Sequence, residues 1–194
     1  TLTWSGQFES MERAATRLKI VTPATLLVIF LLLYLNFRNV TEPLVVMLSI
    51  PFGLVGGIWL IYLNDYNISV AVAVGFIALA GMAAEIGVLV LSFIDAEIKK
   101  RRGAAHRSLA LEDIRDAVLS ATSQRVRPIA MTAISTMAGL IPIMLSTDTG
   151  SDVTHRIAAP MLGGMLTVML LNLLVLPVIY SLVLQYQERR IKVE

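Results

Sequence analysis

Residues 75–95 read GFIALAGMAAEIGVLVLSFID, an apolar run with a single charged residue near its centre, Glu85. The run belongs to an apolar stretch over 68–94, and Asp95 marks the polar edge ten residues beyond Glu85. At about 1.5 Å per helical residue, ten residues span roughly 15 Å, which places Glu85 near the middle of a bilayer. A carboxylate at that depth is costly and therefore indicates a functional site.

Small residues recur at helical spacing on the face of this stretch that carries Glu85. A strip of this kind lets another helix approach closely. We therefore expect Glu85 to face protein or a water-filled path and not lipid. The strip consists of Ala71, Gly75, Ala78, Gly81 and Ser92.

The composition of the 194 residues is that of an integral membrane protein: 56% are hydrophobic, 15% are charged, and the mean hydropathy is +0.75. Five apolar runs each reach the roughly 17 residues needed to cross the hydrocarbon. The predicted fold is all-α, with five transmembrane helices over about 20–37, 44–63, 68–94, 128–145 and 157–184. The chain has no cysteine, which excludes disulfides and thiolate metal sites within it.

Lysine and arginine are distributed unequally between the connections, with twelve of the 16 on one side. By the positive-inside rule that side is cytoplasmic, so residue 1 lies outside and residue 194 inside. Because the basic residues gather beside spans, the net charge of +2 does not predict a nucleic-acid partner. We expect residues 1–19 to be a periplasmic linker from an external domain of a longer protein, since no initiator Met or signal peptide precedes them.

The cytoplasmic connector over 95–127 begins with the basic sequence KKRRG. Beyond it, Leu111, Ile114, Val118 and Ala121 recur at helical spacing opposite a charged face. This pattern predicts an amphipathic helix lying at the membrane interface. A specific lipid or regulatory site is the alternative interpretation.

Two further patterns concern the spans themselves. Gly53 and Gly57 have the small-xxx-small spacing of close helix packing, and we extend that role to Gly81, Gly163 and Gly164. A hydroxyl stripe, formed by Thr132, Ser135 and Thr136, is a candidate wall for a proton path beside Glu85. These hydroxyls also have a simpler interpretation, which is bonding to their own backbone carbonyls.

Metal-binding candidates are weak. Met161, Met165 and Met169 lie on one helical face and could offer thioethers to a soft cation, although methionine is also a common core filler. Asp148, Asp152 and His155 have a spacing that suits one helical face, and capping or solvation explains them as well. Phosphate-binding, zinc-protease and serine-hydrolase motifs do not occur in the sequence, so the chain is not predicted to be an enzyme or to bind a cofactor.

Several segments resemble the C-terminal membrane part of resistance-nodulation-division efflux pumps. RVRPIAMTAISTMAGLIPIML at 125–145 is similar to the penultimate helix of that family, with Arg-Pro-Ile-x-Met-Thr followed by Gly-x-x-Pro. The run at 75–95 is similar to the helix before it, and RIAAPMLGGMLTVMLLNLLVLPVIY to the last helix. Drug exporters of the family carry a Lys where this chain has Glu85, and an acid there resembles the heavy-metal branch.

The resemblance implies part of a proton-driven heavy-metal efflux pump of the bacterial inner membrane, of the copper/silver or the cobalt/zinc/cadmium type. It implies proton movement through Glu85 with Thr132, Ser135 and Thr136 along the path. It also implies a homotrimer, a periplasmic adaptor, an outer-membrane channel, and an N-terminal half that this chain lacks. Metal ions and protons would be cargo and not bound cofactors.

Two alternatives stay open. The first is an exporter of organic drugs, which an aromatic-lined pocket in the external domains would favour. The second is a freestanding truncated membrane module without transport activity. The nucleotide sequence upstream of Thr1 separates the module from a pump. Thr154, where copper and silver pumps of the branch tend to place a Met, leaves the metal undecided.

Overall fold

The chain folds into long helices, and no strand occurs in the parts that the structure describes, residues 7–105, 111–147 and 150–191 of a computed structural model. Five helical segments are long and apolar enough to cross a membrane: Glu12–Phe37, Thr41–Leu63, Val70–Gly103, Leu111–Leu145 and Ser151–Tyr186. The prediction of five spanning helices is confirmed. The helices are α1 (Gln7–Phe37), α2 (Thr41–Gly53), α3 (Val55–Leu63), α4 (Val70–Ala105), α5 (Leu111–Leu145), α6 (Ser151–Leu170), the π-helix η1 (Leu171–Val175) and α7 (Leu176–Ile191).

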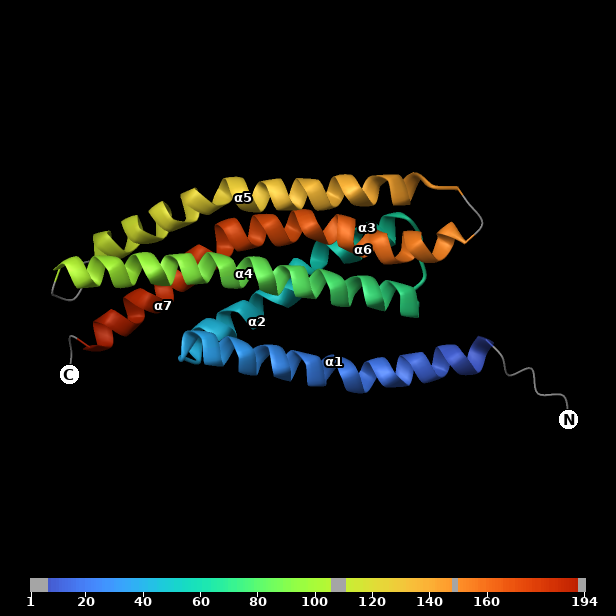
Figure 1. Cartoon of the computed structure of the whole chain (residues 1–194), viewed down its shortest axis with the longest axis horizontal. Coiled ribbons are helices and arrows are strands. Elements are labelled where there is room, and N and C mark those ends of the chain that lie inside the picture. Colours follow the sequence, from blue (N-terminus) through green and yellow to red (C-terminus); the bar gives the residue numbers. More distant parts are fainter. Residues whose placement is uncertain (1–6, 106–110, 148–149, 192–194) are drawn as a thin grey trace, which may run out of the picture.

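α6 is the most central helix of the bundle and packs against α3, α4 and α5. α1 lies at one edge, where it contacts α2 and α4 (Figure 1). The N- and C-terminal ends of the chain lie at opposite ends of the bundle (Figure 1). An odd number of crossings produces this arrangement, in agreement with the five spans.

Two connecting regions differ from their predicted form. The predicted linker over 1–19 is helical from Gln7 onward, because α1 extends the first span without a break. The predicted interface helix is not a separate element, since α5 runs continuously from Leu111 through the span. Three residues of its apolar stripe, Ile114, Val118 and Ala121, are buried in the core cluster that also contains Ile94, whereas Leu111 is exposed.

The second span is interrupted at Leu54, between α2 and α3. Pro51 lies inside α2 and has no amide hydrogen to donate, and Gly53 follows it two residues later. The helical direction is preserved across the interruption, because the amides of Leu54 and Ile58 bond to the carbonyls of Ile50 and Leu54.

The last span contains the five-residue π-helix, in which the Leu176 amide donates to the Leu171 carbonyl. Buried residues of this span recur every four positions: Val168, Asn172, Leu176, Tyr180 and Leu184. In a regular α-helix each four-residue step drifts by about 40°, so these residues would leave a common face. The wider π turn removes part of that drift and keeps all five directed into the bundle.

Glycines set how closely α6 approaches its neighbours. A Cβ atom on Gly57 would lie 2.7 Å from the Pro160 carbonyl oxygen, and one on Gly163 would lie 2.6 Å from that of Gly56. Side-chain atoms at Gly53 and Gly164 would overlap Val168 and Leu79. Gly81 differs from these four, because among the described residues a Cβ atom there would meet nothing within 4 Å.

Gly57→Ala should destabilise the bundle, since the added methyl group would force α3 and α6 apart. Overpacking of this kind costs about 1–3 kcal/mol, which outweighs the gain of up to about 1 kcal/mol in helix propensity. The measurement is thermal unfolding in detergent. Gly103→Ala is the matched control, because that position is open and should be neutral or slightly stabilising. An equal response of the two variants would contradict close packing at Gly57.

Candidate functional site: a groove beside Glu85

Glu85 lies in a groove between α4 and α5 that is closed at one side by α6. The groove has a volume of about 180 Å³. α4 and α5 run in opposite directions along each other, so residues from both helices meet at the same depth (Figure 1). The lining residues are Met82, Glu85, Ile86, Leu89, Arg125, Pro128, Ile129, Thr132, Thr136 and Met165.

The groove brings together Glu85, Thr132 and Thr136 from the predicted proton path. Ser135, the remaining member, is not among the lining residues and is exposed on α5. Glu85 is itself exposed in this chain, so the groove is open on the side away from α6. The carboxylate is therefore reachable from the surface formed by α4 and α5.

Both threonine hydroxyls donate hydrogen bonds to backbone carbonyls one turn earlier. Thr132 Oγ1 donates to the Pro128 carbonyl at 3.1 Å, and Thr136 Oγ1 donates to the Thr132 carbonyl at 2.9 Å. Each oxygen retains lone pairs that can accept a further hydrogen bond. The local bonding expected for these hydroxyls is thus present, and it leaves acceptors along the groove.

Arg125 is a groove residue that the sequence analysis counted only as a cytoplasmic charge. Its guanidinium carbon lies 3.0 Å from the centroid of the Phe93 ring on α4, a cation–π contact. The helical spacing of Arg125 and Thr132 in the RVRPIAMT motif was the signal that could have identified it, because seven residues are two turns of one face.

The candidate metal ligands do not form one site. Met165 is buried and lines the groove, whereas Met161 and Met169 are partly buried. His155 Nε2 is 3.2 Å from Ser146 Oγ, and Asp148 falls outside the described residues. Within 7–105, 111–147 and 150–191, no group of three His, Asp or Glu side chains could hold a metal ion.

A second polar cluster, which the sequence analysis missed, joins the second span to the last. Glu42 is 7% exposed, and its Oε1 accepts hydrogen bonds from Tyr180 Oη at 3.1 Å and from Asn39 Nδ2 at 3.3 Å. Its other oxygen is buried and finds no hydrogen-bond partner within the described parts of the chain. The first-turn position of Glu42 in α2 suits a carboxylate, because the helix dipole is positive there.

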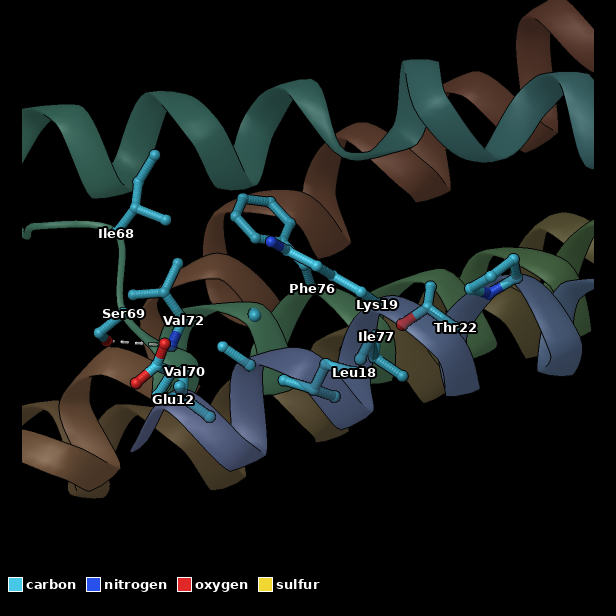
Figure 2. Close-up of a pocket in the computed structure, with 13 residues that line it drawn as sticks. Glu12, Leu18, Lys19, Thr22, Ile68, Ser69, Val70, Val72, Phe76 and Ile77 are labelled. Carbon is cyan, nitrogen blue, oxygen red and sulfur yellow. Dashed lines mark hydrogen bonds between the residues drawn. The ribbon is translucent and has the colours of Figure 1, made fainter. Parts of the chain in front are cut away.

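A larger groove of about 910 Å³ lies between α1 and the start of α4 and shares no residue with the Glu85 groove. Figure 2 shows Glu12, Leu18, Lys19 and Thr22 around it, with Phe76 and Ile77 from α4. The lining is mainly apolar, and its two charged side chains, Glu12 and Lys19, are of opposite sign.

The sequence profile of the AcrB/AcrD/AcrF family matches residues 1–184 of the chain. The chain belongs to the AcrB/AcrD/AcrF family. The cation efflux system protein CusA of Escherichia coli K12 is 45% identical over 190 residues, which are 97% of this chain and 18% of CusA. The cobalt-zinc-cadmium resistance protein CzcA of Cupriavidus metallidurans is 39% identical over 181 residues, 93% of this chain and 16% of CzcA.

A crystal structure of a heavy metal efflux pump has the same fold in this region. It superposes with a TM-score of 0.77 at 33% identity, covering 91% of this chain and 17% of that one. The resemblance to the heavy-metal branch of this family is thus confirmed in sequence and in structure. The chain spans less than a fifth of the length of these relatives.

Tyr180→Phe should destabilise this family member by about 1–3 kcal/mol, because the buried Glu42 carboxylate loses one of its two side-chain hydrogen-bond donors. Thermal unfolding in detergent, compared with Tyr34→Phe, is the measurement. Tyr34 is exposed, so its variant should unfold as the parent does. A Tyr180→Phe variant as stable as the parent would show that the hydrogen bond between α2 and α7 contributes nothing.

Proposed function

We propose that the chain is the C-terminal membrane part of a proton-driven heavy-metal efflux pump, in which Glu85 binds and releases a proton during the transport cycle. The observation that carries the proposal is an accessible carboxylate inside a helix long enough to span a membrane, in a groove with two threonine hydroxyls. Similarity to CusA and CzcA supports the metal cargo.

Protonation of Glu85 would change the electrostatic energy of α4 within the membrane. A charged side chain at the bilayer centre costs about 2.5 kcal/mol or more, and protonation removes that cost. A bias of this size is sufficient to favour one arrangement of packed helices over another. The proton gradient would thereby drive α4 and its neighbours through two states.

Arg125 would place a positive charge at the cytoplasmic end of the groove. Its charge is held over Phe93, two turns from Glu85 along α4, so the carboxylate has a cation in the same groove without a direct ion pair. Thr132 and Thr136 line the groove with Glu85, and Thr136 lies one helical turn farther than Thr132 from Arg125. A proton arriving from outside would meet hydroxyl oxygens first and the carboxylate next.

The assembled pump would be a homotrimer in the bacterial inner membrane, with residue 1 in the periplasm and residue 194 in the cytoplasm. It would act with a periplasmic adaptor and an outer-membrane channel, as an antiporter and not as an enzyme. The metal ion is substrate in this scheme. The N-terminal half of the protein would face the open side of the Glu85 groove.

Glu85→Gln in the complete pump should abolish metal tolerance, because the amide has the shape of the acid but binds no proton. The measurement is growth of a sensitive strain on graded Cu²⁺, Ag⁺, Zn²⁺ and Co²⁺, with an organic dye as the test of drug export. Trimer assembly, followed by native electrophoresis, should be unchanged. Tolerance of the variant equal to that of the parent would refute the proton role. A parent pump that protects against the dye but against none of the metals would favour the drug exporter.

Thr132→Val should reduce metal transport several-fold without abolishing it, because valine keeps the shape of threonine and removes a hydroxyl from the groove. Ser135→Ala is the control, since Ser135 is not among the lining residues. Initial rates in proteoliposomes with an imposed pH gradient are the readout. Equal rates for both variants would remove the hydroxyls from the path.

A further inference from the structure

Asn172 is a buried polar residue in the middle of the last span, and neither the groove nor the Glu42 cluster includes it. It is 1% exposed and projects from η1 into the interface with α4. Its Nδ2 donates a hydrogen bond to the Ala83 carbonyl oxygen at 3.3 Å. Its Oδ1 is buried and has no hydrogen-bond partner among the described residues.

The contact lies at the level of Glu85 but on the other side of α4. Ala83 and Gly87 precede and follow Glu85 by two residues, and two residues correspond to about 200° of helical rotation. A Cβ atom on Gly87 would lie 3.3 Å from Asn172 Oδ1 and 3.4 Å from Val46 Cγ1. Asn172 therefore packs on the face of α4 that is opposite to the carboxylate.

Stability alone does not account for this asparagine. A buried amide oxygen without a donor is destabilising, whereas a leucine, which branches at the same carbon, would bury no polar atom. Single buried polar groups between helices are best known for fixing register at some expense of stability. The π turn that places Asn172 in the interface is likewise a feature enriched at functional sites.

We propose that Asn172 is a positioning residue that sets the rotation of α4 and thereby keeps Glu85 directed into the groove. This inference rests on the proposed proton role of Glu85. A rotation of α4 by one residue, about 100°, would remove the carboxylate from the groove that Thr132 and Thr136 line. The side-chain bond to a main-chain carbonyl opposes that rotation directly.

The charges around Glu85 make the rotation measurable through pH. Arg125 is the charged residue that faces it from α5, and α6 contributes only Met165 to the groove. On α4 the next charge is Asp95, ten residues away, while Glu42 and Tyr180 lie on the side of the bundle where α2 and α7 meet. A rotation of α4 changes the separation of the carboxylate from Arg125, and the pH profile of transport is the readout of that change.

The test uses Asn172→Leu and Gly87→Ala in the full-length pump, reconstituted in proteoliposomes and assayed with Ag⁺ and, separately, with Zn²⁺. The pH of half-maximal transport should differ from that of the parent, because the surroundings of the carboxylate change. Melting temperatures should stay within a few degrees of the parent. Ser49→Ala is the control, because that buried hydroxyl bonds within its own helix, to the Val46 carbonyl, and its pH profile should not move.

Crosslinking gives a readout that does not depend on transport. Leu89→Cys and Ile129→Cys place thiols on the two walls of the groove, in a background without other cysteines. Adding Asn172→Leu should slow their bridging by a bifunctional maleimide several-fold, and adding Ser49→Ala should not. An unchanged crosslinking rate together with an unmoved pH midpoint would overturn the positioning role.

The two hypotheses fail in different ways. If Glu85→Gln is inactive and Asn172→Leu merely lowers the rate at an unchanged pH midpoint, Asn172 is structural and the proton role of Glu85 stands. If Glu85→Gln transports normally, the proton role is refuted, and slowed crosslinking in Asn172→Leu would still establish control of helix rotation.

Discussion

The close approach of α6 to α3 and α4 is the constraint on which the rest of the bundle depends. Lipid tails are as apolar as leucine, so membrane helices are held together mainly by backbone proximity and by interhelical hydrogen bonds. Here Gly56 and Gly163 bring two backbones together, and Gly57 lies against the Pro160 carbonyl. Gly164 accommodates the Leu79 side chain of α4 in the same way.

This packing determines which face of α4 is left open. One side of α4 is occupied by α2 and by the last span, which consists of α6, η1 and α7, with Asn172 bonded to the Ala83 carbonyl. The other side carries Glu85 and, with α5, forms the groove. The π turn contributes to the same result, because it keeps Asn172, Leu176 and Tyr180 directed inward along one helix. An irregularity in one helix thus supports the exposure of a carboxylate on another.

Much of the fold could be predicted from local sequence, for a simple physical reason. A helix that crosses hydrocarbon must satisfy its own backbone and present apolar side chains, so length and hydropathy identify it without knowledge of its neighbours. The interface helix was predicted with the correct buried face, but the structure continues it into the span as part of α5. Ile114 and Val118 are apolar in either setting, and only their contacts show that they pack into the bundle as part of α5.

The sequence by itself determined the number of spans and the presence of a single charged residue within the third apolar run, because these depend on composition and spacing along single helices. Tertiary structure alone decided that Arg125 shares the groove with Glu85, that Gly81 meets no neighbour among the described residues, and that Glu42 pairs with Tyr180. It also decided that Asn172 contacts α4. Each of these facts depends on the rotation and separation of helices distant in sequence, which hydropathy and periodicity do not specify.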